Sequence, residues 1–383
     1  MSASTPDTAE THAWLVLLRA PGLGAAGLRS LVTRAGGAAA ALADIERLRR
    51  EFALGDETLA RLRAPDRVRV DADLDWLAAA PDRRLLTWDD ADYPALLREA
   101  GAAPAALFVT GDISLLWRPQ IAIVGARSAT AGGLANARSF AAHLASAGFV
   151  VTSGLADGVD GAAHAAALDA GGATVAVTGT GPDLVYPRRN GALAARIAAA
   201  GAVVTEFPPG IEARPAHFPR RNRVIAGLSL GVLVVEAGVQ SGSLITARLA
   251  GEQGREVFAL PGSIHNPLAR GCHQLIRQGA RLVETATEIV DELAPLARAL
   301  GERLRERLDA PVPTAEAGPV AMPAAARDAD YTRVLAALGH DPVSLDELAA
   351  RTGFGVPALS SMLLLLELDG DVTSVGGGRY QRL

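Results

Sequence analysis

The chain has 383 residues, of which 49% are apolar and 21% are charged, and this composition is typical of a globular protein with more than one domain. Its net charge is -5, it contains one cysteine, and all 37 basic residues are arginine because lysine is absent. These features exclude a disulfide framework and a lysine-dependent phosphate loop, and no apolar run is long enough to form a membrane-spanning helix. The first residues lack the basic and apolar regions of a signal peptide, so we expect a cytoplasmic protein.

The charge is unevenly distributed along the chain. Residues 121–283 contain 14 arginines and nine acidic residues, a net charge of +5. Residues 1–120 carry a net charge of -3, and residues 284–383 carry -7. A basic centre between acidic flanks indicates a segment that binds nucleic acid or another phosphate-bearing ligand.

Residues 1–80 are expected to form a helical domain of the sterile-alpha-motif or helix-hairpin-helix type. Helix-compatible patterns occur in THAWLVLLRA, GAAGLRSLVTRAGG, AAALADIERLRREF and ETLARLRA. The connector PGLG (21–24) resembles a helix-hairpin-helix turn, in which glycines let backbone N–H groups approach a phosphate. The alternative is a helix-breaking turn in a small bundle.

Residues 81–295 are expected to form an extended Rossmann-like domain. Two short strands, LLTW and ALFVTG, precede six apolar, β-rich runs that alternate with alanine-rich, helix-compatible stretches. The six runs are IAIVGA (121–126), FVVTSG (149–154), ATVAVTG (173–179), AVVTEF (202–207), GVLVVEA (231–237) and REVFALPG (255–262). Such alternation is typical of an α/β fold with a doubly wound, mostly parallel sheet covered by helices on both faces. The ligand of such a sheet lies beyond the carboxyl ends of its strands.

The rest of the chain is expected to contain a linker and a small domain. Residues 296–327 begin as helix and continue as an Ala/Pro-rich linker, over about 309–325. Residues 328–383 contain three helix-compatible stretches and a hairpin, which is the plan of a winged-helix domain. The helix expected to read DNA, GVPALSSMLLLLELDG, contains no arginine, so we expect this domain to act chiefly in protein interaction or packing.

Polar and glycine residues follow the predicted strands at one edge of the sheet. Gly125, Arg127 and Ser128 follow the first of the six strands, Ser153 and Gly154 the second, and Arg188 and Arg189 the third; Ser241, Gly242 and Ser243 follow the fifth and enter a helix. Glycine permits close backbone approach, and helix N-termini and arginines favour anions. Together these loops predict a site for a polyanion.

The stretch HFPRRNRVIAG (217–227) is the densest basic segment in this region. We interpret it as the loop after the fourth strand, with its helix beginning near VIAGLS. In an extended segment Arg221 and Arg223 would share one face while Arg220 serves another. Alternatively, one of these arginines forms an internal ion pair with Glu206 or Glu236.

Familiar nucleotide and catalytic patterns are absent. VGARSATAGG contains no G-x-G-x-x-G, and no pair of histidines has the spacing of a zinc site. Asp157 and Asp160 either act as acid and base or cap the following helix. Cys272 and His273 are either a thiol–imidazole pair or the start of a helix. We therefore expect no metal, no cofactor and no catalytic residues.

Seven ordered segments of the centre resemble the DNA-processing protein A (DprA/Smf) family over about residues 85–285. They are VGARSAT, SGLADGVDGAAH, GTGPDLVYPRRN, EFPPG, HFPRRNRVIAGLS, VVEAGVQSGSLITARLAGEQGREVFALPGSI and RGCHQLIRQGA. The resemblance implies a cytoplasmic homodimer that binds single-stranded DNA in natural transformation. It also implies that the protein protects incoming strands, loads a RecA-type recombinase and is not an enzyme.

The resemblance also assigns roles to residues of this chain. It implies DNA contacts for Arg127 and the FPRRNR run, base contact for Phe218, and a phosphate-facing loop at 241–243. Two departures matter: Asp157 stands where relatives commonly have a basic residue, and lysines near the pocket are absent, so arginines would supply their charge. The predicted DNA-binding set is Gly125, Arg127, Ser128, Ser153, Gly154, Arg188, Arg189, Arg214, Phe218, Arg220, Arg221, Asn222, Arg223, Ser241, Gly242, Ser243 and Thr246.

Two other functions remain as alternatives. One is a nucleotide-processing enzyme similar to phosphoribohydrolases, whose P-G-G-x-G-T-x-x-E pattern is replaced here by EAGVQSGSLIT. The other is a nucleotide-sensing scaffold. Finally, the segments GREVFALPG and CHQLIRQGARLV offer apolar surface and are the expected dimer face.

Overall fold

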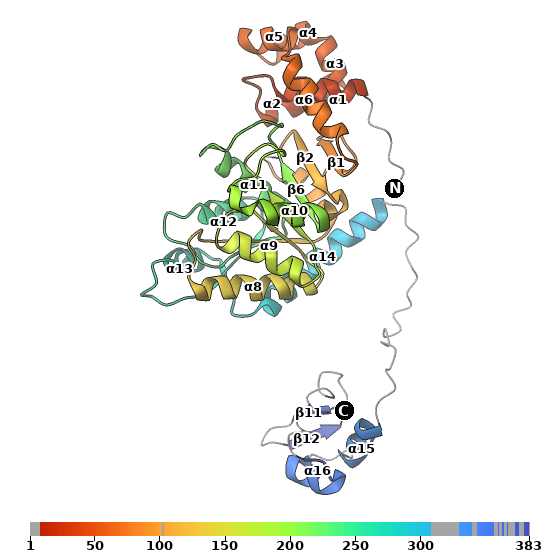
Figure 1. Ribbon diagram of the computed structural model, residues 1–383, viewed down its shortest axis with the longest axis vertical. Coiled ribbons are helices and arrows are strands. Elements are labelled where there is room, and N and C mark those ends of the chain that lie inside the picture. The colour runs from red at the N-terminus through yellow and green to blue at the C-terminus, as the bar shows by residue number, and fades with distance from the viewer. Residues whose placement is uncertain are drawn as a thin grey trace. The chain divides into compact units, whose positions relative to one another are not determined.

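A computed structural model of the chain describes residues 8–101, 103–307, 329–338, 343–355, 359, 362–363, 366, 372–374 and 379–382. The chain forms two compact units, Met1–Ala310 and Pro311–Leu383. Figure 1 shows the helices and strands of both units.

The first unit is built on a nine-stranded sheet. Its strands are β1 (Arg83–Thr87), β2 (Ala106–Gly111), β3 (Gln120–Val124), β4 (Val150–Ser153), β5 (Thr174–Val177), β6 (Ala202–Thr205), β7 (Gly231–Val234), β8 (Glu256–Ala259) and β9 (Arg281–Leu282). Their order is β1-β2-β6-β5-β4-β3-β7-β8-β9. The seven neighbouring strands β6-β5-β4-β3-β7-β8-β9 pair in parallel. Strand β2 pairs antiparallel with both β1 and β6. The doubly wound, mostly parallel sheet expected from the sequence is therefore confirmed.

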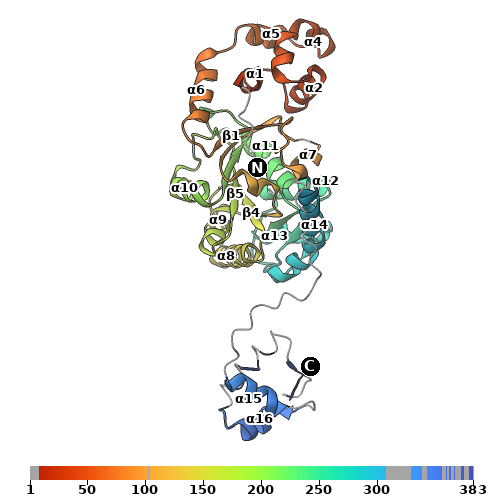
Figure 2. The same ribbon diagram turned by 90° about the vertical axis from the view of Figure 1, so that its right-hand side faces the viewer.

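Helices cover both faces of this sheet, as Figure 2 shows for α8, α9 and α10 on one side and α11 and α12 on the other. Strand β3 explains why, because Ile121 and Ile123 pack into one apolar cluster and Ala122 and Val124 into another. The helices after β1 are α7 (Ala95–Glu99), α8 (Ala131–Ser146), α9 (Val159–Asp169), α10 (Gly191–Ala200), α11 (His217–Leu228), α12 (Gly242–Glu252), α13 (Arg270–Arg277) and α14 (Ala286–Arg307), with 3-10 turns η1 (Ile113–Trp117) and η2 (Arg188–Asn190).

The chain reverses its direction of winding between β3 and β7. From β3 it proceeds through β4 and β5 to β6 on one side, and it then returns to β7, β8 and β9 on the other side. The loops after β3 and β7 therefore separate at the carboxyl edge of the sheet, and this switch point is where doubly wound folds bind their ligands.

A bundle of six helices precedes the sheet. They are α1 (Thr8–Leu18), α2 (Ala25–Ala35), α3 (Ala38–Ala43), α4 (Ile45–Glu51), α5 (Asp56–Arg63) and α6 (Arg67–Ala78). The sequence patterns predicted neither α6 nor the break between α3 and α4 at Asp44. The bundle packs on the sheet through an edge-to-face contact of Trp76 with Phe108, whose ring centroids are 5.9 Å apart. Arg19, whose side chain is 9% exposed, joins Asp73 at 2.5 Å and donates to the carbonyl of Pro209 at 2.9 Å.

The second unit contains α15 (Ala329–Leu338), α16 (Leu345–Thr352), β10 (Val343–Ser344), β11 (Val372–Ser374) and β12 (Arg379–Arg382). The strands pair antiparallel in the order β10-β12-β11, so the predicted hairpin is present and gains a third strand. Buried leucines and valines of these elements form its core. The predicted linker at 309–325 and most of the predicted helix at 355–370 lie outside the described residues.

Candidate nucleic-acid interface

A cavity of about 610 Å³ lies at the switch point. The loop after β3, the first turn of α9, helix α11 and the N-terminus of α12 contribute its walls. Nine members of the predicted set line it: Gly125, Arg127, Phe218, Arg221, Asn222, Ser241, Gly242, Ser243 and Thr246. Residues far apart in the sequence thus meet at one edge of the sheet.

Helix α11 begins at His217, so the expected loop structure of the arginine run is wrong. Pro219 is the third residue of this helix. The N–H groups of the first helical turn have no partner within the helix, so proline is tolerated there. In a helix, residues three apart share a face. Arg220 and Arg223 therefore point together, and Arg221 points elsewhere.

Arg221 is the buried cation of the cavity, and its residue is 5% exposed. Its Nη1 donates to the carbonyl of Val177 at 3.2 Å. A Cβ on Gly154 would overlap the guanidinium, so glycine at this position makes room for the arginine. Burial lowers the pKa of Arg221 to about 10, against the opposing effect of the carboxylate of Asp160, and the guanidinium stays charged at neutral pH.

Asp160 lies in the first turn of α9 and is buried beside this arginine. Its carboxylate accepts from the backbone N–H of Gly154 at 3.2 Å and of Ala156 at 3.4 Å. Burial raises its pKa, while Arg221 and the backbone N–H groups lower it. Gly158, not an aspartate, is the N-cap of α9. Asp160 therefore orders the loop after β4 and offsets part of the charge of Arg221.

His164 belongs to the same buried network. Its Nδ1 lies 2.6 Å from Oγ1 of Thr174, which itself donates to the carbonyl of Val151. Because Oγ1 is a donor to that carbonyl, Nδ1 is assigned as the protonated nitrogen. Burial and the charge of Arg221 lower the pKa of His164 to about 3, so its imidazole is neutral at pH 7.

Arg127 and Phe218 stand at the mouth of the cavity. The guanidinium of Arg127 lies 5.4 Å from the ring centroid of Phe218, and the ring of Tyr186 lies 5.6 Å from it on a tilt of 41°. Arg127 is exposed and has no ion-pair partner in the described part of the chain. Tyr186, 47% exposed, lines the cavity but was not in the predicted set. The sequence stretch VYPRRN contains it, yet nothing local indicates that it meets Phe218.

The N-terminus of α12 forms the opposite wall. Ser241 is its N-cap and lies 2.7 Å from Ser243 between hydroxyl oxygens. Asn222 donates through Nδ2 to the carbonyl of Gly242 at 3.2 Å, which fixes α12 against α11. Backbone N–H groups and the helix dipole at such an N-terminus favour an anion.

Glu236 holds the loop after β3. It accepts from the N–H of Thr130 at 2.8 Å, from the hydroxyl of Thr130 at 2.7 Å and from Nδ2 of Asn266 at 3.2 Å. A Cβ on Gly133 would overlap its carboxylate. Of the two predicted partners for the arginine run, Glu236 therefore fixes the start of α8, and Glu206 binds the arginines.

Several predicted residues lie outside the cavity lining. Direct DNA contact by Ser153 is contradicted, because it is fully buried and donates to the carbonyl of Ile123 at 2.6 Å. Gly154 is also buried and contributes through the space that it leaves for Arg221. Ser128 is exposed in the loop that carries Arg127.

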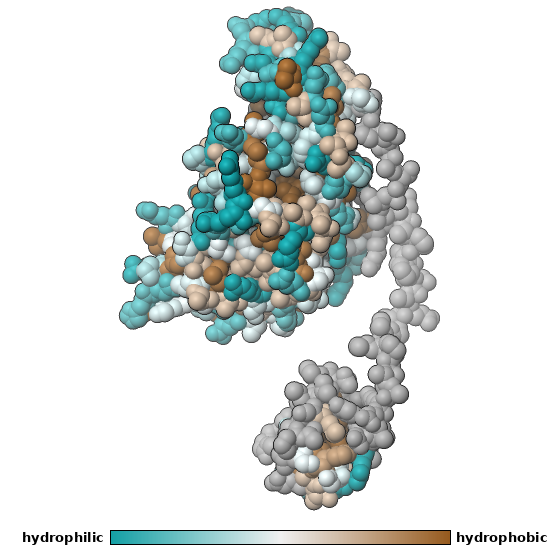
Figure 3. All heavy atoms as spheres, viewed as in Figure 1, coloured by the Kyte–Doolittle hydropathy of each residue, from teal (hydrophilic) through white to brown (hydrophobic). Residues whose placement is uncertain are grey.

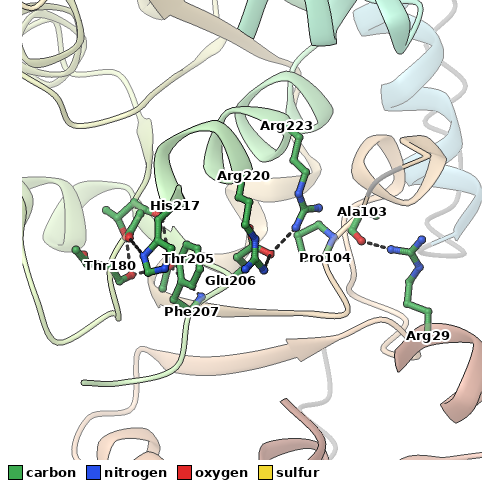
Figure 4. Close-up of polar contacts among 12 residues, drawn as sticks. Arg29, Ala103, Pro104, Thr180, Thr205, Glu206, Phe207, His217, Arg220 and Arg223 are labelled. Atoms are coloured by element: carbon green, nitrogen blue, oxygen red, sulfur yellow. Dashed lines mark hydrogen bonds and ion pairs between the residues drawn. The ribbon is translucent and has the colours of Figure 1, made fainter. Parts of the chain in front are cut away.

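The remaining arginines of the set have other positions. Arg188 and Arg189 are exposed in η2, where Arg189 binds Asp157 through Nε at 2.6 Å, which lowers the pKa of that carboxyl. The expected acid, base or cap role of Asp157 is thus replaced by an ion pair. Arg220 binds Glu206 at 3.1 Å and Arg223 binds the same oxygen, as Figure 4 shows. The hypothesis that an arginine of this run pairs with Glu206 is confirmed, and two arginines share that carboxylate.

Other chemistry is not assembled in the described residues. No group of three His, Cys, Asp or Glu side chains there is arranged to hold a metal ion. The thiol of Cys272 faces the carbonyls of Val234 and Val235, and burial raises its pKa to about 11. His273 instead contacts the carbonyl of Gly262 at 3.0 Å, so a thiol–imidazole pair is wrong. None of the described helices is long and apolar enough to cross a membrane.

Comparisons with known proteins identify the family of the chain. Residues 84–294 match the family described as DNA recombination-mediator protein A, and residues 318–378 match the DprA winged helix domain. Protein Smf of Escherichia coli is 42% identical over 318 residues, which cover 83% of this chain and 82% of that protein. The DNA processing protein DprA of Streptococcus pneumoniae is 46% identical over 200 residues, covering 52% of this chain and 71% of that protein.

Two solved structures are also similar. The crystal structure of DprA from Streptococcus pneumoniae has a TM-score of 0.66 at 35% identity and covers 73% of this chain and 97% of that one. A structure of DNA processing protein A from Helicobacter pylori, described for its single-stranded DNA binding mode, has a TM-score of 0.51 at 28% identity. It covers 55% of this chain and 96% of that one.

Proposed function

The chain belongs to the DNA recombination-mediator protein A family, and from this premise we propose that the cavity at the switch point binds single-stranded DNA. The observation that carries the proposal is the convergence of buried Arg221, exposed Arg127 and the N-terminus of α12 on one cavity. A phosphate there meets a buried guanidinium, an exposed one and helix N–H groups.

Phe218 supplies the second element that single-strand binding needs. Its ring lines the cavity between Arg127 and Tyr186, within reach of a base. Stacking on an aromatic side chain accepts any base, because each base has a π-face. The site therefore binds with little sequence preference, and its affinity falls as salt concentration rises.

We propose that the protein acts by binding and not by catalysis. In this role it protects incoming single strands during natural transformation in the cytoplasm and loads a RecA-type recombinase onto them. The titratable groups at the cavity support this role, since Asp160 is committed to backbone N–H groups and His164 lies buried and neutral. We also propose that the domain boundaries lie at residues 80, 295 and 327, as the sequence analysis expected.

A homodimer is proposed through the far edge of the sheet. The edge strand β9 is exposed at both residues, and Leu282, Ile264 and Val239 are exposed by 43%, 73% and 58%. A groove of about 580 Å³ runs between α12 and the end of α13 on this side. Light scattering of the full chain is expected to give twice the monomer mass, and Ile264→Asp with Leu282→Asp is expected to reduce it to the monomer mass. A wild type that is monomeric at high concentration would contradict the dimer.

The test of DNA binding is a titration of labelled oligo-dT at several salt concentrations. Wild type is expected to bind with an affinity that falls with salt, and Arg127→Ala is expected to weaken binding about tenfold, as loss of one charge-assisted contact implies. Arg138→Ala, an exposed arginine on α8, is the matched control. No binding by wild type, or equal binding by both variants, would refute the proposal. Release of free base from a nucleoside monophosphate would favour the phosphoribohydrolase alternative.

A further inference from the structure

A second hollow, of about 620 Å³, lies between the N-terminal bundle and the sheet. We call it the bundle groove. In Figure 3 apolar residues gather in the middle of the face shown, below the mostly polar bundle. Two arginines that the sequence placed in the DNA site, Arg214 and Arg220, line this groove and not the cavity.

The bundle side of the groove carries two arginines that share one carboxylate. Asp66 is paired with both Arg69, at 3.3 Å, and Arg61, at 3.9 Å. One carboxylate thus serves two guanidinium groups, and both are about half exposed or more. Glu57 also lines the groove, so these four side chains together carry no net charge, and the positive charge of the groove comes from the sheet side.

The sheet side repeats the arrangement. Glu206 is buried, and one of its oxygens serves both Arg220 and Arg223. Arg214 is exposed, and its guanidinium forms no ion pair or hydrogen bond with another described residue. The groove therefore concentrates positive charge although the first 120 residues carry a net charge of -3.

The groove also offers groups that suit a base. Phe207 and His217 stack with ring centroids 4.2 Å apart, and the guanidinium of Arg220 lies 5.1 Å from the ring of Phe207. Figure 4 shows these residues beside Glu206. Cations beside aromatic rings are typical of single-strand sites.

The groove and the cavity are two sides of one helix. Phe218, Arg221 and Asn222 of α11 line the cavity, while His217 and Arg220 line the groove. Pro215, on the cavity side, is next to Arg214, on the groove side. Because a helix with its side chains is only about 10 Å across, one strand can pass over the start of α11 and reach both.

The PGLG connector adds backbone donors to the groove. Gly22 has a φ of +76°, and Gly24 is the N-cap of α2 without a side chain that could satisfy the first N–H groups. Leu23 and Ala25 line the groove on either side of Gly24. The turn ends one helix and begins the next, which fits both the helix-hairpin-helix and the bundle interpretations, and it borders the groove that the arginines line.

We propose that the bundle groove is a second binding segment for the same single strand. It takes the phosphates of nucleotides that continue from the cavity, with Arg61, Arg69 and Arg214 as their partners. This inference rests on the proposed function of the cavity, and it gives the N-terminal bundle a direct part in holding DNA.

The test compares two oligo-dT lengths, one of about six nucleotides that fills the cavity and one of about thirty that also reaches the groove. The full chain carrying Arg61→Ala and Arg69→Ala is expected to bind the long oligonucleotide about tenfold more weakly and to show a salt slope smaller by about 1.4. Its affinity for the short oligonucleotide is expected to stay within twofold of wild type.

The matched control is Arg47→Ala with Arg63→Ala. These arginines belong to the same bundle, are similarly exposed and pair with Asp44 and Glu46 outside the groove. The inference would be overturned if the two double variants bound the long oligonucleotide with equal affinity. It would also be overturned if Arg61→Ala with Arg69→Ala weakened binding of both oligonucleotide lengths equally, or if it weakened binding only of a duplex DNA probe. Failure of wild type to bind either length would instead refute the proposed function. Thermal melting of each variant checks that the bundle remains folded.

Discussion

The two sides of α11 use arginine in opposite ways. On the cavity side Arg221 is buried, held by the carbonyl of Val177 and surrounded by the space that Gly154 leaves. On the groove side Arg220 is exposed and shares Glu206 with Arg223. A buried, preorganised cation loses little freedom when a phosphate binds, whereas an exposed one must be ordered. The same helix thus supplies a rigid anchor and an adaptable surface.

The largest expected effect comes from Arg221→Ala. Removing the buried guanidinium takes away its hydrogen bond to Val177 and the charge that stabilises the nearby carboxylate of Asp160, so we expect the free energy of unfolding to fall by about 3–5 kcal/mol, together with loss of oligonucleotide binding. Urea unfolding measures the first effect. The control on the other face, Arg220→Ala, is expected to cost less than about 1 kcal/mol, because Arg220 is exposed and buried Glu206 keeps Arg223 as its partner. Equal losses from the two variants would remove the distinction between the faces.

Gly154→Ala should act on the same arginine without removing it. The added Cβ overlaps the guanidinium, so Arg221 must leave its position, at a cost of about 1–3 kcal/mol in unfolding free energy. We expect oligonucleotide affinity to fall by tenfold or more. Gly238→Ala is the control, because nothing lies within 4 Å of a Cβ there. Unchanged DNA affinity in Gly154→Ala would mean that the position of Arg221 does not matter for binding.

Phe218→Ala tests the stacking part of the cavity. Loss of one base–aromatic stack is expected to weaken binding by about 1–3 kcal/mol, with little change in the salt slope because no charge is removed. Phe218→Tyr keeps the ring and should bind nearly as wild type. A tyrosine variant as weak as the alanine variant would indicate that Phe218 packs the loop and does not contact a base.

The pH dependence of stability tests the buried network behind Arg221. The pKa of His164 is lowered to about 3 in the folded state, so below about pH 6.5 the unfolded chain takes up a proton that the folded chain refuses. This histidine therefore makes stability fall as pH drops from about 6.5, by up to about 1.4 kcal/mol per pH unit. Urea unfolding at pH 7.5, 6.5 and 5.5 should show a shallower dependence for His164→Gln. Identical slopes would mean that His164 is protonated in the folded protein.

The smallest effect is expected from removing residues 311–383. The cavity and the bundle groove both belong to the first unit, so oligo-dT affinity should fall by less than tenfold. A larger loss in the same titration would give the second unit a direct role in DNA binding.

Much of the fold followed from local patterns in the sequence. Short apolar runs alternating with helix-compatible stretches predicted the doubly wound sheet, because burial on both faces requires apolar residues throughout each strand. The same reasoning placed Arg127, Phe218 and Ser241 at one edge, since the carboxyl ends of parallel strands lie together. Family resemblance in seven ordered segments pointed to the same region.

The directions of individual side chains did not follow from those patterns. The arginine run was interpreted as an extended loop, whereas it belongs to α11, which tolerates Pro219 because this residue stands in the first helical turn. Ser153 was placed in the site by its position after a strand, whereas it points between strands and bonds with Ile123. Tyr186 was missed because its approach to Phe218 joins two separate loops.

By itself the sequence determined the order of strands and helices and the edge of the sheet at which charge gathers. Both depend on apolar periodicity and residue type, which act over a few neighbouring residues. Only the tertiary structure decided that Arg221 is buried in the space beside Gly154, that Arg220 and Arg223 share Glu206, and that Arg61 and Arg214 face one groove. These relations join segments far apart in the chain, and they arise from packing, in which each side chain takes the space and the partners that distant residues leave to it.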